Sequence, residues 1–567
     1  MLKILPKELI IGVLAALLFI PFLGNVHLFD WDEINFAECA REMFINKDYG
    51  RVYINFMPFW EKPPFFFWLQ VLSMHAFGVG DFAARFPNAI CGIVTLVVLF
   101  KIGQRLLSDT FGLIWALMYA GSILPNLYFH SGIIDPWFNL FIFLSLYFFI
   151  LYFWQKEKFS LTGYSNSPTF YIAMSGIFIG LALITKGPAA LLIFGLTIAI
   201  RWIFFKFKFY FSISNALMFV VATASISMVW YGYEYFKNGP WFIKEFVKYN
   251  FRLFSTPDAG HGGFPGYHFV VLLVGCFPAS LFFIHGHYIK ADQRPHLSDF
   301  KLHMLILFWV VLVLFSIVKS KIVHYSSLCY FPLTYVAAYS AYHIFIGDIK
   351  MQKWIIWSLA FLGGLIGLIV TSFPFLAQNK TLLKQLLAKD PFAVANLDVV
   401  VNWYGYEFLV GIFVFAFIIL SVWFFLKNKS QFGISVLFGG SSIMVVLILW
   451  AFIGRIESFS QGTAIEFFKS LAGKDCYVIT YNYKSFAHYY YARVKPSNRP
   501  KNIDKNKPSE SIAIWKDSLL LGSKVKKDVY LLTKFDRKEG LERYPELKLL
   551  WEKNGWSAFV RPKKEIN

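Results

Sequence analysis

Long apolar segments recur along most of this chain, each near the ~20 residues that a helix needs to cross a bilayer. Short polar or charged stretches separate these segments. The segments on either side of 185–188 are divided only by Lys186-Gly187-Pro188, so a single long bent hairpin is the alternative there. The pattern predicts thirteen membrane-spanning helices, at about 8–29, 82–106, 110–128, 133–154, 169–185, 188–205, 211–234, 267–289, 303–318, 325–346, 354–375, 406–426 and 432–453.

The loops between these segments predict the orientation of the chain. The N-terminus carries two lysines before a long apolar run, and it lacks the short apolar core and small-residue cleavage site of a signal peptide. We therefore expect an uncleaved first helix that starts in the cytoplasm. Every second loop is then basic, as cytoplasmic loops are. The alternate loops include three long ones, at about 30–81, 235–266 and 376–405, and an odd number of spans puts the C-terminus outside.

The tail from residue 455 onward differs from the rest because it is charged and its apolar segments are short. The stretches 475–480 and 528–533 are typical of strands, with a Pro- and Lys-rich segment between them. We predict an all-α polytopic membrane domain over 1–454, with outer juxtamembrane helices, followed by a small extracytoplasmic soluble α/β domain over 455–567.

Composition supports a membrane setting. Hydrophobic residues make up 57% of the chain and charged residues 16%, whereas soluble domains average roughly 25% charged. The net charge of +20 is concentrated in short loops, where it suits anionic lipid headgroups, so membrane lipids rather than nucleic acid are the expected partners. The five cysteines are scattered and form no CxxC pair, which argues against a disulfide framework or a zinc knuckle.

The first outer loop holds the densest group of acidic residues. It begins Asp30-Trp31-Asp32-Glu33, directly after the first span, and an amphipathic helix follows. Asp32 suits the N-cap of that helix, where a carboxylate accepts backbone N–H bonds. Carboxylates at a membrane edge are expensive unless they are used, and an ionised Asp32 there could instead accept a proton from an incoming hydroxyl.

Two further acidic motifs precede apolar helices. Glu61-Lys62 lies against an aromatic interfacial segment: it is either a surface ion pair or a site where Lys62 binds phosphate and Glu61 binds a cation or sugar. Asp135-Pro136 opens a span, where Asp and Pro also suit the cap and first turn of a helix.

Several cations lie at other outer junctions. Lys186, and the group Lys319-Ser320-Lys321 followed by His324-Tyr325, either bind an anion or are lysines that extend to the interface. His261 lies in a glycine-rich outer loop and is a weak metal or substrate candidate. The predicted topology places all these groups on one face, from six separate segments. This favours a composite site, rich in carboxylates and cations, at the outer membrane surface.

Taken together, these segments resemble the GT-C superfamily of membrane glycosyltransferases. Their order and spacing are most similar to the lipid A aminoarabinose transferases and to related protein O-mannosyltransferase-like bacterial enzymes. The resemblance reaches to about residue 345 and rests on Asp32-Glu33, Ala37-Glu38, Arg41-Glu42-Met43, Glu61-Lys62-Pro63, Asp135-Pro136, Thr185-Lys186-Gly187, Ser320-Lys321 and His324-Tyr325. Trp-Asp-Glu-Ile-Asn stands where close aminoarabinose transferases have an Asp-Glu-Thr-Arg pattern, so the sugar and the acceptor stay open.

The resemblance implies an inverting transfer of a sugar from a polyprenyl-phosphate donor to a lipid, glycan or protein acceptor at the outer face of a bacterial inner membrane. It assigns catalysis to Asp32, Glu33 and Asp135, and a divalent metal (zinc, magnesium or manganese) to Glu61 and His261. The donor phosphate would be bound by Lys62, Lys186, Lys321 and Tyr325. The chain has no Gly-rich nucleotide loop, so we expect no nucleotide cofactor.

Two other functions are compatible with a polytopic chain. A transporter or flippase of lipid-linked glycans would place ionisable groups near the bilayer midplane and often shows internal repeats. Here the charges gather at one face and no repeat is visible. A scaffold that presents the tail would leave the clustered acids and lysines without a role.

Overall fold

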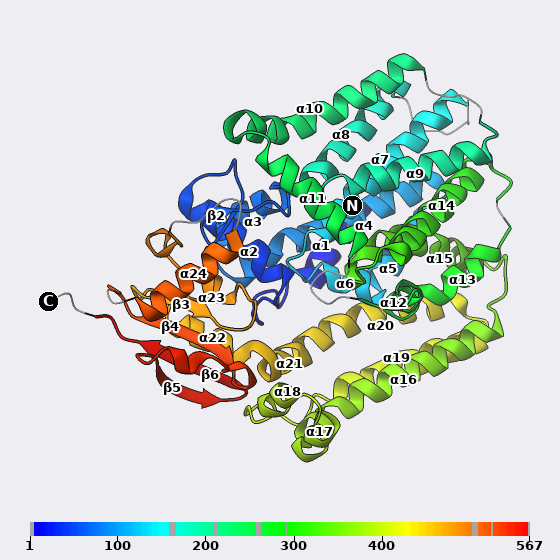
Figure 1. Cartoon of the computed structure of the whole chain (residues 1–567). Coiled ribbons are helices and arrows are strands. Elements are labelled where there is room, and N and C mark those ends of the chain that lie inside the picture. The colour runs from blue at the N-terminus through cyan, green and yellow to red at the C-terminus, as the bar shows by residue number, and fades with distance from the viewer. Residues whose placement is uncertain are drawn as a thin grey trace.

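The computed structural model shows a large helical bundle with a small β-sheet at one end (Figure 1). It describes residues 5–157, 166–207, 212–256, 262–290, 292–501, 508–522 and 525–564. The bundle confirms the predicted helical membrane fold. Its first half consists of α1 (Lys7–Phe19), α3 (Phe65–Phe77), α4 (Asp81–Leu106), α5 (Asp109–Ala120), α6 (Ile123–Tyr128), α7 (Asp135–Lys156), α8 (Pro168–Lys186), α9 (Ala189–Phe204) and α10 (Ile213–Asn238).

The second half of the bundle begins with two short helices that meet at an angle of 110°. They are followed by five longer helices and a 3-10 segment. The elements are α12 (Tyr267–Gly275), α13 (Ala279–Tyr288), α14 (Pro295–Ile317), η1 (Val323–Cys329), α15 (Tyr330–Phe345), α16 (Lys353–Gln378), α19 (Leu409–Leu426) and α20 (Ser430–Ile448).

Each predicted apolar stretch coincides with a helix or a pair of helices. In the described part of the chain, eight helices are long and apolar enough to cross a membrane, or nine if the bent pair α12 and α13 is one span. The chain is therefore a multi-pass membrane protein, while the count of thirteen spans stays a prediction. The predicted break near 185–188 is real, because α8 ends at Lys186 and α9 begins at Ala189.

The most buried of the candidate spans is α7, which is apolar on nearly all sides, as expected of a helix surrounded by neighbours. Within its most apolar window, 83% of residues are buried. The corresponding share is only 17% for α10 and 22% for α16, which lie at opposite edges of the bundle (Figure 1). Their exposed apolar side chains suit contact with lipid.

Several short elements lie at the end of the bundle that carries the sheet (Figure 1). The loop after α1 forms the helix α2 (Asp32–Asn46) and a small hairpin of β1 (Tyr53–Ile54) and β2 (Met57–Pro58). The loop after α10 forms α11 (Trp241–Ser255), and the loop after α16 forms α17 (Lys380–Leu386) and α18 (Pro391–Asn396). These helices lie in the three long loops where the sequence predicts juxtamembrane helices.

The C-terminal part follows α20 without a break in the helix. The helical run from Ser430 to Ser470 has 41 residues, and it crosses the predicted boundary at 454 as η2 (Leu449–Ile453), α21 (Gly454–Glu457), η3 (Ser458–Gly462) and α22 (Thr463–Ser470). The elements beyond it are β3 (Tyr477–Thr480), α23 (Ala487–Tyr491), η4 (Pro496–Asn498), α24 (Pro508–Leu521), β4 (Val529–Lys534), η5 (Phe535–Arg537), η6 (Leu541–Arg543), β5 (Lys548–Lys553) and β6 (Trp556–Arg561).

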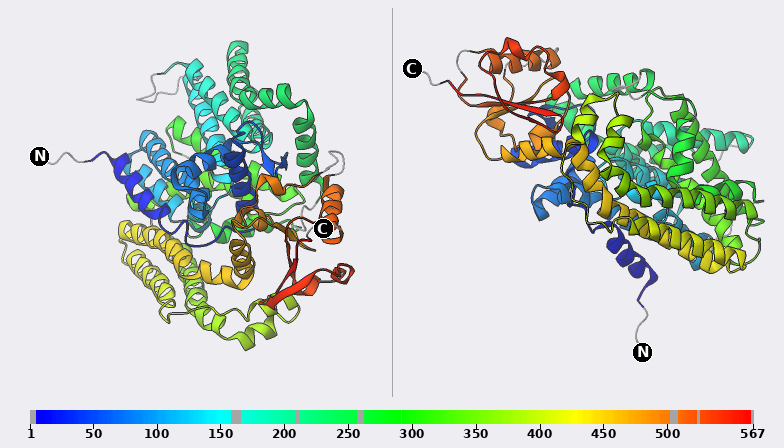
Figure 2. Two further views of the ribbon diagram at one scale, coloured as in Figure 1. Left: turned by 90° about the vertical axis from the view of Figure 1, so that its left-hand side faces the viewer. Right: turned by 90° about the horizontal axis from the view of Figure 1, so that it is seen from below.

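The four strands form one mixed sheet in the order β3-β4-β6-β5. The two predicted strands are β3 and β4, and they pair in parallel. The hairpin β5–β6, which the sequence analysis did not foresee, adds two antiparallel strands. The sheet projects from one end of the bundle (Figure 2).

The C-terminal part packs on α2 rather than standing apart. Buried residues of α2, α3, α22, α23 and the sheet share one hydrophobic cluster. Polar contacts reinforce it: the backbone N–H of Leu28 donates to the Tyr491 hydroxyl at 2.6 Å, and Arg41 donates to the Val494 carbonyl at 3.1 Å. The division into domains 1–454 and 455–567 stays a prediction.

Close packing between α4 and α5 gives a test of the bundle. A Cβ at Gly112 would lie 2.4 Å from the Phe100 carbonyl oxygen, so a methyl group there forces the helices apart. We expect Gly112→Ala to lower the free energy of unfolding by about 1–3 kcal/mol. Gly195→Ala on α9, where no atom lies within 4 Å of the added Cβ, is the control. Equal thermal unfolding of both variants in detergent would contradict the packing.

Candidate active site

Asp32 is the first residue of α2, but it does not cap that helix. The N-cap residue is Trp31, and no side chain caps the helix end. The Asp32 carboxylate instead faces η1, where its Oδ2 lies 3.7 Å from Nε2 of His324. About a third of the Asp32 side chain is exposed. It is therefore a carboxylate that a substrate can reach.

A second pair joins two spanning helices at their ends. Lys186, the last residue of α8, donates to Asp135, the first residue of α7, at 2.6 Å. Asp135 is buried and Lys186 is nearly so. Pro136 fits the first turn of α7 because a helix leaves that N–H without a partner. The cap interpretation of Asp135 is therefore wrong: Ile134 is the N-cap residue, no side chain caps this helix end, and the Asp135 carboxylate binds a cation instead.

The turn after Lys186 explains why the two helix ends can approach α11. Gly187 has a φ of +102°, which L side chains rarely adopt. A Cβ there would also lie 2.3 Å from the ring of Phe246 on α11. Glycine at this position lets α11 pack directly on the turn that carries Lys186.

Lys62 and Tyr325 complete the group. The Lys62 ammonium donates to the hydroxyl of Tyr249 on α11 at 3.4 Å and lies 4.9 Å from the centre of its ring. The Lys186 ammonium lies 5.6 Å from the Tyr325 ring. Five predicted residues from five segments therefore meet around His324: Asp32, Lys62, Asp135, Lys186 and Tyr325.

The charges of this group act on one another. Burial lowers the pKa of His324 below its ordinary value, although Asp135 and Asp32 act in the opposite direction. His324 is therefore neutral at pH 7 and can accept or donate a hydrogen bond. Burial also raises the pKa of the Tyr325 hydroxyl, so it stays a donor. The site combines a reachable carboxylate with ammonium and hydroxyl donors.

The structure describes only one of the two predicted metal ligands. Glu61 is half-buried beside Lys62, close enough to Cys39 for its charge to act on that thiol. His261 lies outside the described residues. Within the part of the chain that the structure describes, no three His, Cys, Asp or Glu side chains are grouped closely enough to hold a metal ion.

Glu33 has a different environment from the one that a catalytic role requires. It is buried, and its carboxylate binds the Arg85 guanidinium through both oxygens at 2.9 and 2.8 Å. It also accepts the N–H groups of Phe29 and Gly132. Burial alone would raise the pKa of Glu33, but the charge of Arg85 outweighs it and the pKa is lowered. With every direction occupied, Glu33 holds the loop structure and has no free face for a substrate.

Lys321 also departs from its expected role as a ligand of the donor phosphate. It is buried, and its ammonium donates to the carbonyls of Phe315, Ser316 and Val318 at the end of α14. These are the carbonyls that a helix C-terminus leaves without partners. Lys321 therefore caps the end of α14. The neighbouring Ser320 hydroxyl donates to the carbonyl of Thr256, the residue that follows α11, at 3.0 Å.

Two residues in the group had no assigned role in the sequence analysis. His324 was noted only as a neighbour of Tyr325, and Tyr249 was not singled out. Tyr249 also lies 5.4 Å from the Arg252 guanidinium, so α11 adds a cation to this side of the site. The strong amphipathic pattern of α11 was the signal that could have pointed to it.

Comparison with solved structures identifies the fold. The chain superposes on ArnT from Cupriavidus metallidurans bound to undecaprenyl phosphate with a TM-score of 0.76, covering 98% of both chains at 16% identity. The apo state of the same protein gives 0.72 at 15% identity, again over 98% of both chains. The chain has the ArnT fold. This confirms the resemblance to GT-C glycosyltransferases that the sequence predicts.

Sequence comparisons agree with this fold. The family model described as "Dolichyl-phosphate-mannose-protein mannosyltransferase" matches residues 61–231. The undecaprenyl phosphate-alpha-4-amino-4-deoxy-L-arabinose arabinosyl transferase of Wigglesworthia glossinidia brevipalpis is 24% identical over 54% of this chain and 53% of its own. The namesake in Edwardsiella ictaluri is 27% identical over 58% of each. The chain thus spans little more than half the length of these relatives. The descriptions of these similar proteins give no support to the flippase alternative.

The environment of Glu33 gives a prediction. In Glu33→Gln the buried Arg85 loses its counter-charge, so we expect the free energy of unfolding to fall by about 3–5 kcal/mol. Glu245→Gln, which breaks an exposed ion pair with Lys248, should cost under about 1 kcal/mol. Unfolding by a denaturing detergent in mixed micelles measures both. An unchanged Glu33→Gln midpoint would return Glu33 to the list of catalytic candidates.

Proposed function

We propose that this protein is a glycosyltransferase that moves a sugar from a polyprenyl-phosphate donor to an acceptor hydroxyl or phosphate on a lipid, glycan or protein. The observation that carries the proposal is the meeting of Asp32, Lys62, Asp135, Lys186 and Tyr325 at one end of a bundle with the ArnT fold. The solved relative is bound to undecaprenyl phosphate, which supports a polyprenyl-phosphate donor here.

The group suits an inverting displacement. An acceptor oxygen forms a bond to C1 of the sugar while the bond from C1 to the phosphate oxygen breaks. The proton of the acceptor passes to the Asp32 carboxylate, which is exposed enough to be reached and lies beside neutral His324. The electron pair of the broken bond leaves with the polyprenyl phosphate.

The cations of the site would stabilise that leaving phosphate. Lys62 and the Tyr325 hydroxyl are its proposed donors, because charge that develops on an oxygen is best stabilised by donors that are already in place. Lys186 adds a second positive charge, and Asp135 holds it in position through their 2.6 Å hydrogen bond. In this assignment Asp135 positions a cation rather than exchanging a proton.

A divalent metal would add positive charge at the same place. Glu61 and His261 would hold zinc, magnesium or manganese, and the ion would act as an electrostatic clamp on the phosphate. We expect purified protein to contain about one equivalent of metal that is lost in Glu61→Gln, with Glu245→Gln as the control. Equal metal content in the two variants, measured by atomic emission, would remove Glu61 as a ligand.

We also propose that the site faces the outer side of a bacterial inner membrane. The basic loops predicted to lie in the cytoplasm and the charged group at the other helix ends support this placement. The C-terminal sheet would then lie outside as well. A protease added to spheroplasts should cleave the exposed C-terminal part; complete protection there, with cleavage in inverted vesicles, would reverse the orientation.

The central prediction concerns Asp32. With a radiolabelled polyprenyl-phosphate sugar and a membrane acceptor fraction, wild type should transfer label, and Asp32→Asn should lose about 10²-fold or more of the rate because proton transfer is removed. Asp398→Asn, a change in an exposed ion pair, should keep the activity. Equal rates in folded wild type and Asp32→Asn would exclude Asp32 as the base.

A further inference from the structure

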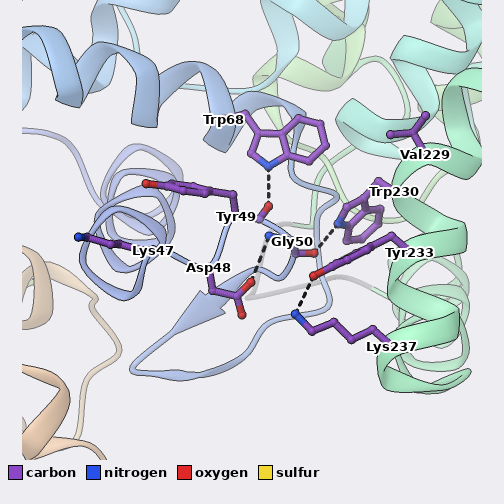
Figure 3. Close-up of a pocket in the computed structure, with 9 residues that line it drawn as sticks. All are labelled: Lys47, Asp48, Tyr49, Gly50, Trp68, Val229, Trp230, Tyr233 and Lys237. Atoms are coloured by element: carbon purple, nitrogen blue, oxygen red, sulfur yellow. Dashed lines mark hydrogen bonds between the residues drawn. The ribbon is translucent and has the colours of Figure 1, made fainter.

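A pocket lies away from the Asp32 group, between the loop after α2, the first half of α3 and the end of α10 (Figure 3). Its volume of about 500 Å³ is within the range of small-ligand sites. It is lined by Lys47, Asp48, Tyr49, Gly50, Trp68, Val229, Trp230, Tyr233 and Lys237. The proposed transfer reaction gives none of these residues a role.

Aromatic rings form the walls of this pocket. The indole N–H of Trp68 donates to the Tyr49 carbonyl, and that of Trp230 donates to the Gly50 carbonyl, each at 2.8 Å. Both indole N–H groups donate to backbone carbonyls of the loop after α2, and the faces of the rings line the cavity (Figure 3). Trp230 is only 2% exposed, so its position is held by the surrounding protein.

Glycine at position 50 sets the shape of the pocket. A Cβ there would lie 2.3 Å from the ring of Tyr233, so only glycine lets that ring lie against the loop. The ring stays 42% exposed. The pocket therefore keeps an accessible aromatic face that a single methyl group would displace.

The lining also has polar groups of both signs, although the Lys47 side chain extends away from the Trp68, Trp230 and Tyr233 rings (Figure 3). The Lys237 ammonium donates to the Tyr233 hydroxyl at 2.6 Å, while Lys47 makes no hydrogen bond or ion pair with any described residue. Asp48 accepts from the Gly50 N–H and the Tyr53 hydroxyl. A sugar ring matches this lining, since it has flat C–H faces for aromatic rings and hydroxyls that both donate and accept.

Other ligand classes use less of the lining. A phosphate ion would bind the ammonium groups but would gain nothing from the aromatic walls. A lipid tail would pack on the rings but would cover the lysines and the carboxylate. Val229, 69% exposed on α10, adds an apolar side chain to the lining of the pocket.

The pocket is separated from Asp32 by the length of α2. Asp32 begins this helix of 15 residues and Lys47 follows its end, so the two places are about 22 Å apart along it. We propose that the pocket is a glycan-binding subsite, which holds a sugar ring of the acceptor remote from the group that reacts. This inference rests on the proposed transfer reaction, and it implies an acceptor with several linked sugars.

Direct binding tests the pocket independently of transfer. Saturation-transfer NMR with methyl α-glucopyranoside should show millimolar binding of equal strength to wild type and Asp32→Asn. Lys237→Gln should weaken binding by about two- to fivefold, and Gly50→Ala should weaken it further. Lys244→Gln, an exposed lysine on α11 outside the pocket, should have no effect. Glucose 1-phosphate and inorganic phosphate separate a sugar site from an anion site.

The outcomes are distinct. Equal sugar binding to wild type, Lys237→Gln and Gly50→Ala would overturn the proposal, and so would binding of inorganic phosphate with no binding of the neutral sugar. In transfer assays, Lys237→Gln should raise the KM for a multi-sugar acceptor and leave the KM for the donor unchanged. If Asp32→Asn still transfers sugar while the pocket binds as expected, the mechanism fails but the subsite stands.

Discussion

The buried ion pair between Glu33 and Arg85 is the contact on which the arrangement of the active-site group depends. Arg85, on α4, also donates to the carbonyls of Leu23, Val26 and His27. Glu33 accepts the N–H of Gly132, in the turn that leads to Asp135. One pair of charges thus joins the loop before Asp32, a spanning helix and the turn before α7. Because a buried charge without a partner is so costly, separating these three segments would carry a large penalty.

The C-terminal part contacts α2 and the loop before it. Tyr491 accepts from the Leu28 N–H and donates to Asp81, and Gln461 donates to the Leu28 carbonyl. Arg41 and Glu38, both buried on α2, form an ion pair whose guanidinium also binds the Val494 carbonyl. The sheet and its helices therefore act as part of the frame around Asp32. The C-terminal part thus helps to fix the position of α2, the helix that Asp32 begins.

The charges at the helix ends fit this frame. Lys186 and Asp135 end one helix and begin another, so each can stay charged while the rest of its helix is apolar. A charge at the end of a spanning helix avoids most of the cost that the bilayer centre would impose.

The sequence by itself determined the helices of the bundle and most of the residues that lie together around His324. Apolar stretches of this length can satisfy their backbone groups in lipid only as helices, so α4, α7, α8 and α14 follow from composition. The breaks at Asp135-Pro136 and Lys186-Gly187-Pro188 likewise placed charged residues at helix ends. The strands β3 and β4 were visible as short apolar runs, whereas β5 is an edge strand whose side chains are mostly exposed, so it carries no alternation to recognise.

Only the tertiary structure decided which of two residues adjacent in sequence faces the group around His324. Asp32 and Glu33 are adjacent in sequence, but successive residues of a helix point about 100° apart, so one faces His324 and the other faces Arg85. Lys321 turns to the carbonyls that end α14, and Tyr249 reaches Lys62 because α11 folds back over the turn at Gly187. Such contacts join segments that are far apart along the chain. They depend on how helices rotate and pack, which local residue patterns do not encode.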